Sequence, residues 1–271
     1  MKVFISADME GVSGVVDASQ TRMDEREYER ARRLMTGEVN AAIEGALVAG
    51  ATEIVVNDSH GSMRNLLIEE INPACQLISG SPKPLSMMQG IGPEYDAAFF
   101  VGYHAGAGSS PSVLDHTYLG KVVYQAAVNG QVLGETGFNA LLAGHFGVPV
   151  ALVTGDETVC REAQALLGDV ETVAVKTAYG RLAARCQPPE RARALIREGA
   201  QRALGRTHAP FRVAPPLRLT LDVLNTAMAD MAEMVPGVLR DGPRRLEYGS
   251  DDALMLYRAF RSMIVLALSV A

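Results

Sequence analysis

VFISADMEG, residues 3–11, joins a run of apolar residues to two carboxylates, Asp8 and Glu10. A short apolar run that ends in polar residues and glycine is typical of a buried strand in a parallel sheet. Comparable runs occur at 53–56, 97–101, 149–153 and 170–175. Strands of this kind, separated by helical segments, predict an α/β fold with a mostly parallel sheet flanked by helices.

Helical spacing fills the intervals between these runs. Apolar side chains recur every three or four residues at 25–49, and Gly50 then provides a C-terminal stop. Further helices are expected at 137–146 and 157–167. Asn129-Gly130 favours a tight hairpin turn after a further strand, so the sheet is not expected to be purely parallel throughout.

The pattern of expected strands and helices changes toward the C-terminal end of the chain. Strands are expected at 217–223 and 244–248, and a final helix at 251–271. Ser250 or Asp251 is the expected N-cap of that helix. This pattern predicts a smaller α+β C-terminal portion.

Length and composition indicate one folded unit. The chain has 271 residues, of which 48% are apolar and 21% are charged, and this supplies a large buried core. We expect residues 1–271 to form a single unit. A subdivision is predicted into a core at 1–165, which carries the functional site, and a C-terminal portion at 166–271.

The charge and the cysteines restrict partners and compartment. A formal net charge of -6 is unsuited to polyphosphate backbones, so no nucleic-acid partner is expected.

The three cysteines, Cys75, Cys160 and Cys186, are odd in number and form no CxxC pair. This argues against a disulfide framework and favours a reducing, cytoplasmic compartment. The apolar stretch at 263–271 is too short to cross a bilayer, so we expect no membrane association and interpret it as a buried helix end or a subunit contact.

Side chains that can bind metal follow three of the expected strands. Asp8 and Glu10 follow the first, and His60 and His104 end the segments VVNDSH and FFVGYH. The carboxyl ends of neighbouring parallel strands open on one crevice, where these four residues would meet. Two carboxylates two residues apart on extended backbone point the same way, and a cation relieves their repulsion. The sequence therefore predicts a metal site.

Each candidate also has a plainer interpretation. Asp8 and Glu10 would cap a loop, His60 would be a turn histidine, and His104 would be a histidine satisfied within the core. His116, in the segment LDHT, is a candidate proton donor or acceptor, and its plainer interpretation is an exposed loop histidine. The joint placement of the first four residues at strand ends favours the metal site.

Six ordered segments resemble the M55 family of zinc-dependent D-aminopeptidases. The segments are SADMEGVSG, VNDSHGSM, LISGSPKPLSMMQG, GYHA, DHT and LGETGFNA. The resemblance covers residues 1 to about 155 and continues more weakly at 174–176 and 234–237. It implies two zinc ions per subunit, with Asp8 bridging both. Glu10 and His60 would complete one ion's ligands, and His104 and Glu135 the other's.

The resemblance also implies a catalytic role for His116 and a homodecamer of two stacked pentamers. Glu135 is assigned by resemblance alone, because its plainer interpretation is an acid favoured by the dipole at a helix start. The sequence departs from the family's pattern in the Gly/Ser-rich loop after His104 and at Asp115, which precedes His116.

The expected function is that of a metallo-aminopeptidase acting on short peptides. It would release an N-terminal residue, a D-amino acid such as D-Ala, by attack of a hydroxide that bridges the two ions, and His116 would protonate the leaving amine. Two alternatives remain open. One is a two-metal enzyme that cleaves another amide, an ester or a phosphoester, and the other is a non-catalytic protein that binds peptides in the presence of zinc.

Overall fold

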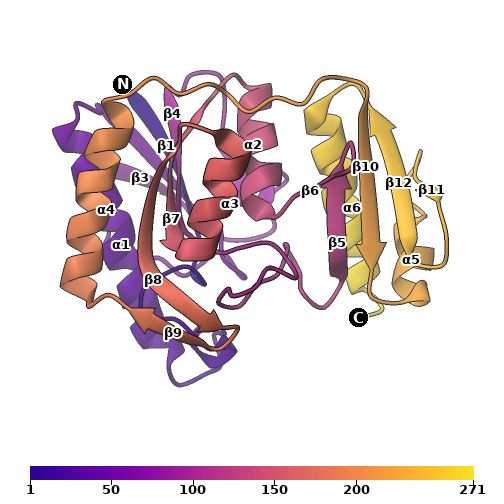
Figure 1. Cartoon of the computed structure of the whole chain (residues 1–271), viewed down its shortest axis with the longest axis horizontal. Helices are drawn as coiled ribbons and strands as arrows, with labels where there is room; N and C mark the ends of the chain where they lie inside the picture. The colour runs from indigo at the N-terminus through magenta and orange to yellow at the C-terminus, as the bar shows by residue number, and fades with distance from the viewer.

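The computed structural model describes residues 1–271 and contains two sheets that lie side by side (Figure 1). The larger sheet contains β1 (Lys2–Ala7), β2 (Glu53–Asp58), β3 (Cys75–Ile78), β4 (Ala97–Tyr103), β7 (Val150–Asp156), β8 (Glu171–Gly180) and β9 (Ala183–Cys186). Its strand order is β3-β2-β1-β4-β7-β8-β9, and every neighbouring pair is parallel except β8 and β9. The predicted α/β fold with a mostly parallel sheet is confirmed.

The smaller sheet is antiparallel. It contains β5 (Val123–Val128), β6 (Gln131–Val132), β10 (Leu217–Val223), β11 (Leu239–Arg240) and β12 (Arg245–Ser250). The order is β11-β12-β10-β5-β6, and the Asn129-Gly130 hairpin joins β5 to β6 as predicted. The chain thus enters this sheet in β5 and β6, returns to the larger sheet in β7, β8 and β9, and re-enters the smaller sheet in β10. Each sheet therefore contains strands from both sides of residue 165.

Six α-helices cover the sheets. They are α1 (Tyr28–Val48), α2 (Glu135–His145), α3 (Glu157–Leu167), α4 (Pro189–Leu204), α5 (Thr226–Ala232) and α6 (Ala253–Leu268), with single 3-10 turns η1 (Ala18–Gln20) and η2 (Ser86–Met88). Helices α1 and α4 pack on one face of the larger sheet, and α2 and α3 on the other (Figure 1). Helix α6 packs on the smaller sheet and against α2, so one apolar core joins the two sheets.

The central strands owe their position to their composition. In β4 all seven residues are buried, and in β1 only the first is not, as expected for parallel strands covered on both faces. Because β2, β1 and β4 are parallel neighbours, their carboxyl ends lie at one edge of the sheet.

The predicted helices at 25–49, 137–146 and 251–271 begin and end within a few residues of α1, α2 and α6, and the helix at 157–167 matches α3 at both ends. Helix α1 ends at Val48, and Gly50 follows with φ +94°, as its C-terminal stop requires. The predicted cap of α6 is wrong: Asp252 is the N-cap, and its carboxylate accepts from the backbone N–H groups of Leu254 and Met255. No helix combines the length and the apolar character that a membrane crossing requires.

Candidate metal centre

The five predicted metal ligands lie together beyond the carboxyl ends of β1, β2 and β4. His60 Nδ1 lies 2.9 Å from Glu10 Oε2 and 3.2 Å from Asp8 Oδ1. His104 Nε2 lies 3.6 Å from Asp8 Oδ2 and 3.4 Å from Glu135 Oε1. The Asp8 carboxylate thus stands between the two histidines and presents one oxygen to each.

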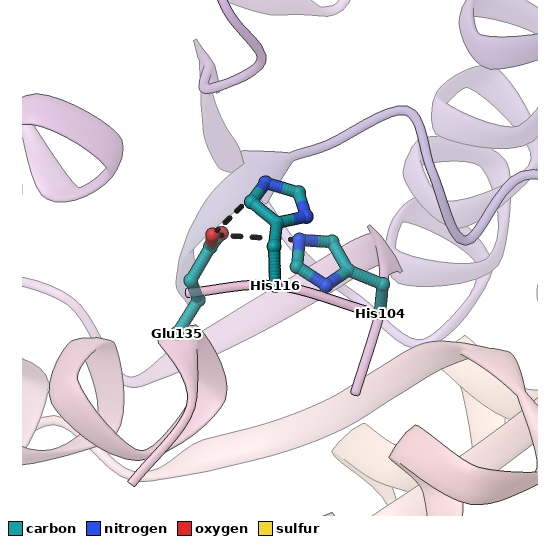
Figure 2. A group of neighbouring side chains, drawn as sticks. All are labelled: His104, His116 and Glu135. Atoms are coloured by element: carbon teal, nitrogen blue, oxygen red, sulfur yellow. Dashed lines mark ion pairs between the residues drawn. The ribbon is translucent and has the colours of Figure 1, made fainter. Parts of the chain in front are cut away.

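His116 joins the cluster from the loop that precedes β5. Its Nε2 lies 3.6 Å from Glu135 Oε1, and its ring stacks on that of His104 with centroids 4.1 Å apart. Figure 2 shows both imidazoles facing the Glu135 carboxylate. Glu135 is the first residue of α2, and the backbone N–H of Tyr118 donates to its Oε1 at 2.6 Å. The helix start therefore aims this carboxylate at the two histidines.

Each histidine in the cluster is oriented by a backbone carbonyl. One ring nitrogen lies 2.9 Å from a carbonyl oxygen, and the other ring nitrogen faces the carboxylates. A neutral imidazole that donates its N–H to the carbonyl presents a lone pair to the carboxylates. The acceptors for His60, His104 and His116 are the carbonyls of Thr21, Ala105 and Leu114 respectively.

Several buried atoms of the cluster have no hydrogen-bond partner. These are Asp8 Oδ2, Glu10 Oε2 and His104 Nε2. Buried acceptors without a donor are costly, and a cation among them removes that cost. Imidazole nitrogens and carboxylate oxygens are also the donors that zinc accepts. The arrangement therefore fits a metal ion.

Burial and the facing charges also shift the pKa values of the cluster. Burial raises the pKa of Asp8 to about 7, and the charge of Glu10 adds to the effect. Burial lowers the pKa of His104, but the charges of Glu135, Asp8 and Glu10 outweigh it and raise the value to about 10. Without metal, protons therefore compensate the facing carboxylates at neutral pH, and a bound cation would displace them.

A close approach of two chain segments places the first carboxylates beside His104. The N–H of Gly11 donates to the carbonyl of Gly102 at 2.8 Å. A Cβ atom on Gly11 would lie 1.9 Å from the carbonyl oxygen of Tyr103, so only glycine fits at this position. This glycine is the one that follows Asp8 and Glu10 in the segment ADMEG.

Lys176 and Lys83 anchor the loops that follow β1 and β2. Burial lowers the pKa of each ammonium to about 8. Each donates to oxygens at a strand end and so holds the backbone that carries the cluster. The acceptors of Lys176 are the carbonyls of Glu10, Val12 and Val15, and those of Lys83 are Asn57 Oδ1 and the carbonyl of Asp58.

A cavity of about 320 Å³ opens beside the cluster. Asp8, His60, His116 and Glu135 line it together with Arg261 and apolar residues of α6. The side chain of His116 is 21% exposed, compared with 10% for His60 and 1% for His104, so His116 is the histidine that a bound molecule reaches most easily.

Two residues near the cavity differ from what the sequence suggests. Asp115 turns away from His116: it forms an ion pair with Arg181 at 3.0 Å and accepts from the N–H of Gly108. Arg261 lines the cavity although no sequence motif marks it. Its position in a helical apolar pattern, between Phe260 and Ser262, carries no local signal for a site.

Comparisons with known proteins agree with this geometry. The profile of the M55 peptidase family, described as D-aminopeptidase, matches residues 1–262. A D-aminopeptidase of Bacillus subtilis (strain 168) is 38% identical over 271 residues, which cover 99% of this chain and 98% of that protein. The solved structure of the Zn-dependent D-aminopeptidase DppA from Bacillus subtilis, described as a self-compartmentalizing protease, matches with a TM-score of 0.96 at 36% identity and covers 99% of this chain and 98% of its own. The chain therefore belongs to the M55 family of D-aminopeptidases.

Proposed function

We propose that this protein is a zinc-dependent D-aminopeptidase that releases the N-terminal residue of short peptides at a centre of two ions. The observation that carries the proposal is the buried set of facing lone pairs on Asp8, Glu10 and His104. Zinc dependence in DppA and the description of the family support the same reading.

The two faces of the Asp8 carboxylate support two ion positions. Asp8, Glu10 and His60 would hold one ion, because these residues approach one another on the Oδ1 side. Asp8, His104 and Glu135 would hold the other, on the Oδ2 side. Bound zinc would supply polarisation of the scissile carbonyl and a nucleophile from water at neutral pH.

His116 is the residue that we assign to proton transfer. Its Nδ1 is fixed by the carbonyl of Leu114, so Nε2 is the nitrogen that faces the cluster. Burial, followed by the charge of His104, lowers the pKa of His116, so the ring is neutral at pH 7 and can accept a proton before it passes one to the leaving amine.

Chelation combined with a substrate panel tests the proposal. Chelator-treated protein is expected to lose hydrolysis of D-Ala-D-Ala and to regain it on addition of zinc, and metal analysis is expected to find two zinc ions per chain. L-Ala-L-Ala and p-nitrophenyl phosphate should be poor substrates. Efficient phosphoester cleavage would instead favour another two-metal hydrolase. Zinc-dependent binding of D-Ala-D-Ala without turnover would favour a peptide-binding protein.

We further propose that the protein is a cytoplasmic homo-oligomer, namely a decamer. The self-compartmentalizing character of DppA supports assembly. Val265, Leu268 and Val270 expose apolar side chains at the end of α6, as a subunit contact would require. The three free cysteines suit a reducing compartment. Sedimentation velocity separates a decamer from a monomer, and a monomer at micromolar concentration would contradict the assembly.

A further inference from the structure

Arg261 occupies the part of the cavity contributed by α6. It is the only lysine or arginine among the residues that line this cavity. Its guanidinium carbon stands 5.0 Å from the centroid of the Tyr118 ring, and this cation–π contact fixes its direction. The side chain is partly buried.

The guanidinium has no anionic partner within the protein. Arg261 forms no side-chain hydrogen bond and no ion pair, whereas the exposed Arg197, Arg218 and Arg245 each pair with a carboxylate. Guanidinium groups often bind carboxylates through two parallel hydrogen bonds, and a partly buried guanidinium without an acceptor is unfavourable. The side chain is therefore ready to accept a carboxylate that enters the cavity.

The cavity lining carries charges of both signs. Asp8 and Glu135, the carboxylates of the cluster, contribute negative charge, and Arg261 contributes a positive charge. The whole chain carries a formal net charge of -6, so a free carboxylate meets little other attraction. A volume of about 320 Å³ is at the small end of ligand cavities and suits a short peptide.

We propose that Arg261 binds the C-terminal carboxylate of the substrate and makes the enzyme selective for short peptides with a free C-terminus. The proposal rests on the proposed aminopeptidase function. An aminopeptidase places the first residue of its substrate at the catalytic cluster, so the next charge of a dipeptide is its C-terminal carboxylate. Leu119 and Ile264, which also line the cavity, offer an apolar surface for the second side chain.

Three substrates and three variants test this assignment. The substrates are D-Ala-D-Ala, its C-terminal amide, and the amide of D-Ala-D-Glu, which moves the carboxylate to a side chain. The variants are Arg261→Met, which keeps the apolar stem, Arg261→Lys, which keeps the charge, and Arg258→Met, an exposed arginine of the same helix, as the matched control.

Arg261→Met is expected to lower kcat/KM for D-Ala-D-Ala by roughly 10- to 100-fold, chiefly through KM, because it loses a charge-assisted hydrogen-bonded pair. Its activity on D-Ala-D-Ala amide should stay within about twofold of the wild type, because that substrate lacks the anion. Arg261→Lys should recover part of the loss, and Arg258→Met should match the wild type on all three substrates.

Equal losses on the acid and the amide would overturn the proposal, because they would show that Arg261 acts by packing on Tyr118. Unchanged kcat/KM for D-Ala-D-Ala in Arg261→Met would overturn it directly. A loss confined to D-Ala-D-Glu amide would assign the arginine to a side-chain carboxylate and would also contradict it. If the wild type cleaves none of the three substrates, the proposed function fails first, and the role of Arg261 fails with it.

Discussion

Asp8→Asn is expected to lower kcat/KM by about 1,000-fold or more, since metal polarisation contributes several kcal/mol to the transition state and each 1.36 kcal/mol is a factor of ten. Asparagine keeps the shape of the side chain but removes the charge that faces both His60 and His104. A bridging amide cannot balance two dications, so the variant is expected to retain fewer zinc ions than the wild type.

Metal content and kinetics measured on the same preparation check this prediction. Asp241→Asn is the matched control, because Asp241 is exposed and lies beside the smaller sheet, away from the cluster. The control should keep its zinc and its kcat/KM. A variant at Asp8 that keeps two zinc ions and full activity would remove Asp8 from the centre and, with it, the proposal of a shared carboxylate.

The convergence of the cluster could be predicted because it follows from the topology of a few strands. Three apolar runs end in Asp8, His60 and His104, and each run is short, continuous and rich in β-branched or aromatic residues. Such runs form parallel strands, and parallel neighbours bring their carboxyl ends together. In the structure β1 pairs in parallel with both β2 and β4, which brings the three strand ends together.

The second sheet could not be predicted from local pattern in the same way. Val128 pairs with Leu219, far along the chain, and no residue near either strand encodes that partner.

Competition between adjacent polar residues explains the misplaced helix cap. Ser250, Asp251 and Asp252 can all cap a helix, and the backbone entering α6 selects Asp252. Local pattern therefore predicts the helix, but it does not select one cap among three adjacent candidates.

Glu135 could not be identified as a site residue from the local sequence pattern. An acid at the first position of a helix is favoured by the helix dipole wherever the helix lies. Only the packing of α2 against β4 directs this carboxylate toward His104 and His116. The resemblance to a family identified Glu135 because a family's motif reflects tertiary packing. Local periodicity carries no such information.

His116→Ala is expected to lower kcat by roughly 100- to 10,000-fold, the range that removal of a general acid or base produces. Zinc content and KM are expected to stay near the wild-type values, because the carboxylates and the other two histidines remain. His145→Ala is the matched control, since His145 ends α2 and lies beside Asp252, away from the cluster.

The pH profile gives a second readout of the same variant. Burial, and then the charge of His104, lowers the pKa of His116 below its ordinary value near 6.5, and bound cations would act in the same direction. Activity that needs neutral His116 is therefore complete at pH 7 and is lost as the pH falls through that lowered pKa. In His116→Ala the residual kcat/KM should lack this acid limb.

Zinc content decides between the two chemical roles open to His116. Ligand atoms of His104, His116 and Glu135 all lie within 4.8 Å of one another, so His116 is placed closely enough to bind an ion as well as to carry a proton. A ligand would take zinc with it when removed, and KM and metal affinity would change together with kcat. A proton carrier leaves the ions in place and removes only the step that needs a proton. Loss of zinc from His116→Ala would therefore identify this histidine as a metal ligand. Another group would then have to protonate the leaving amine.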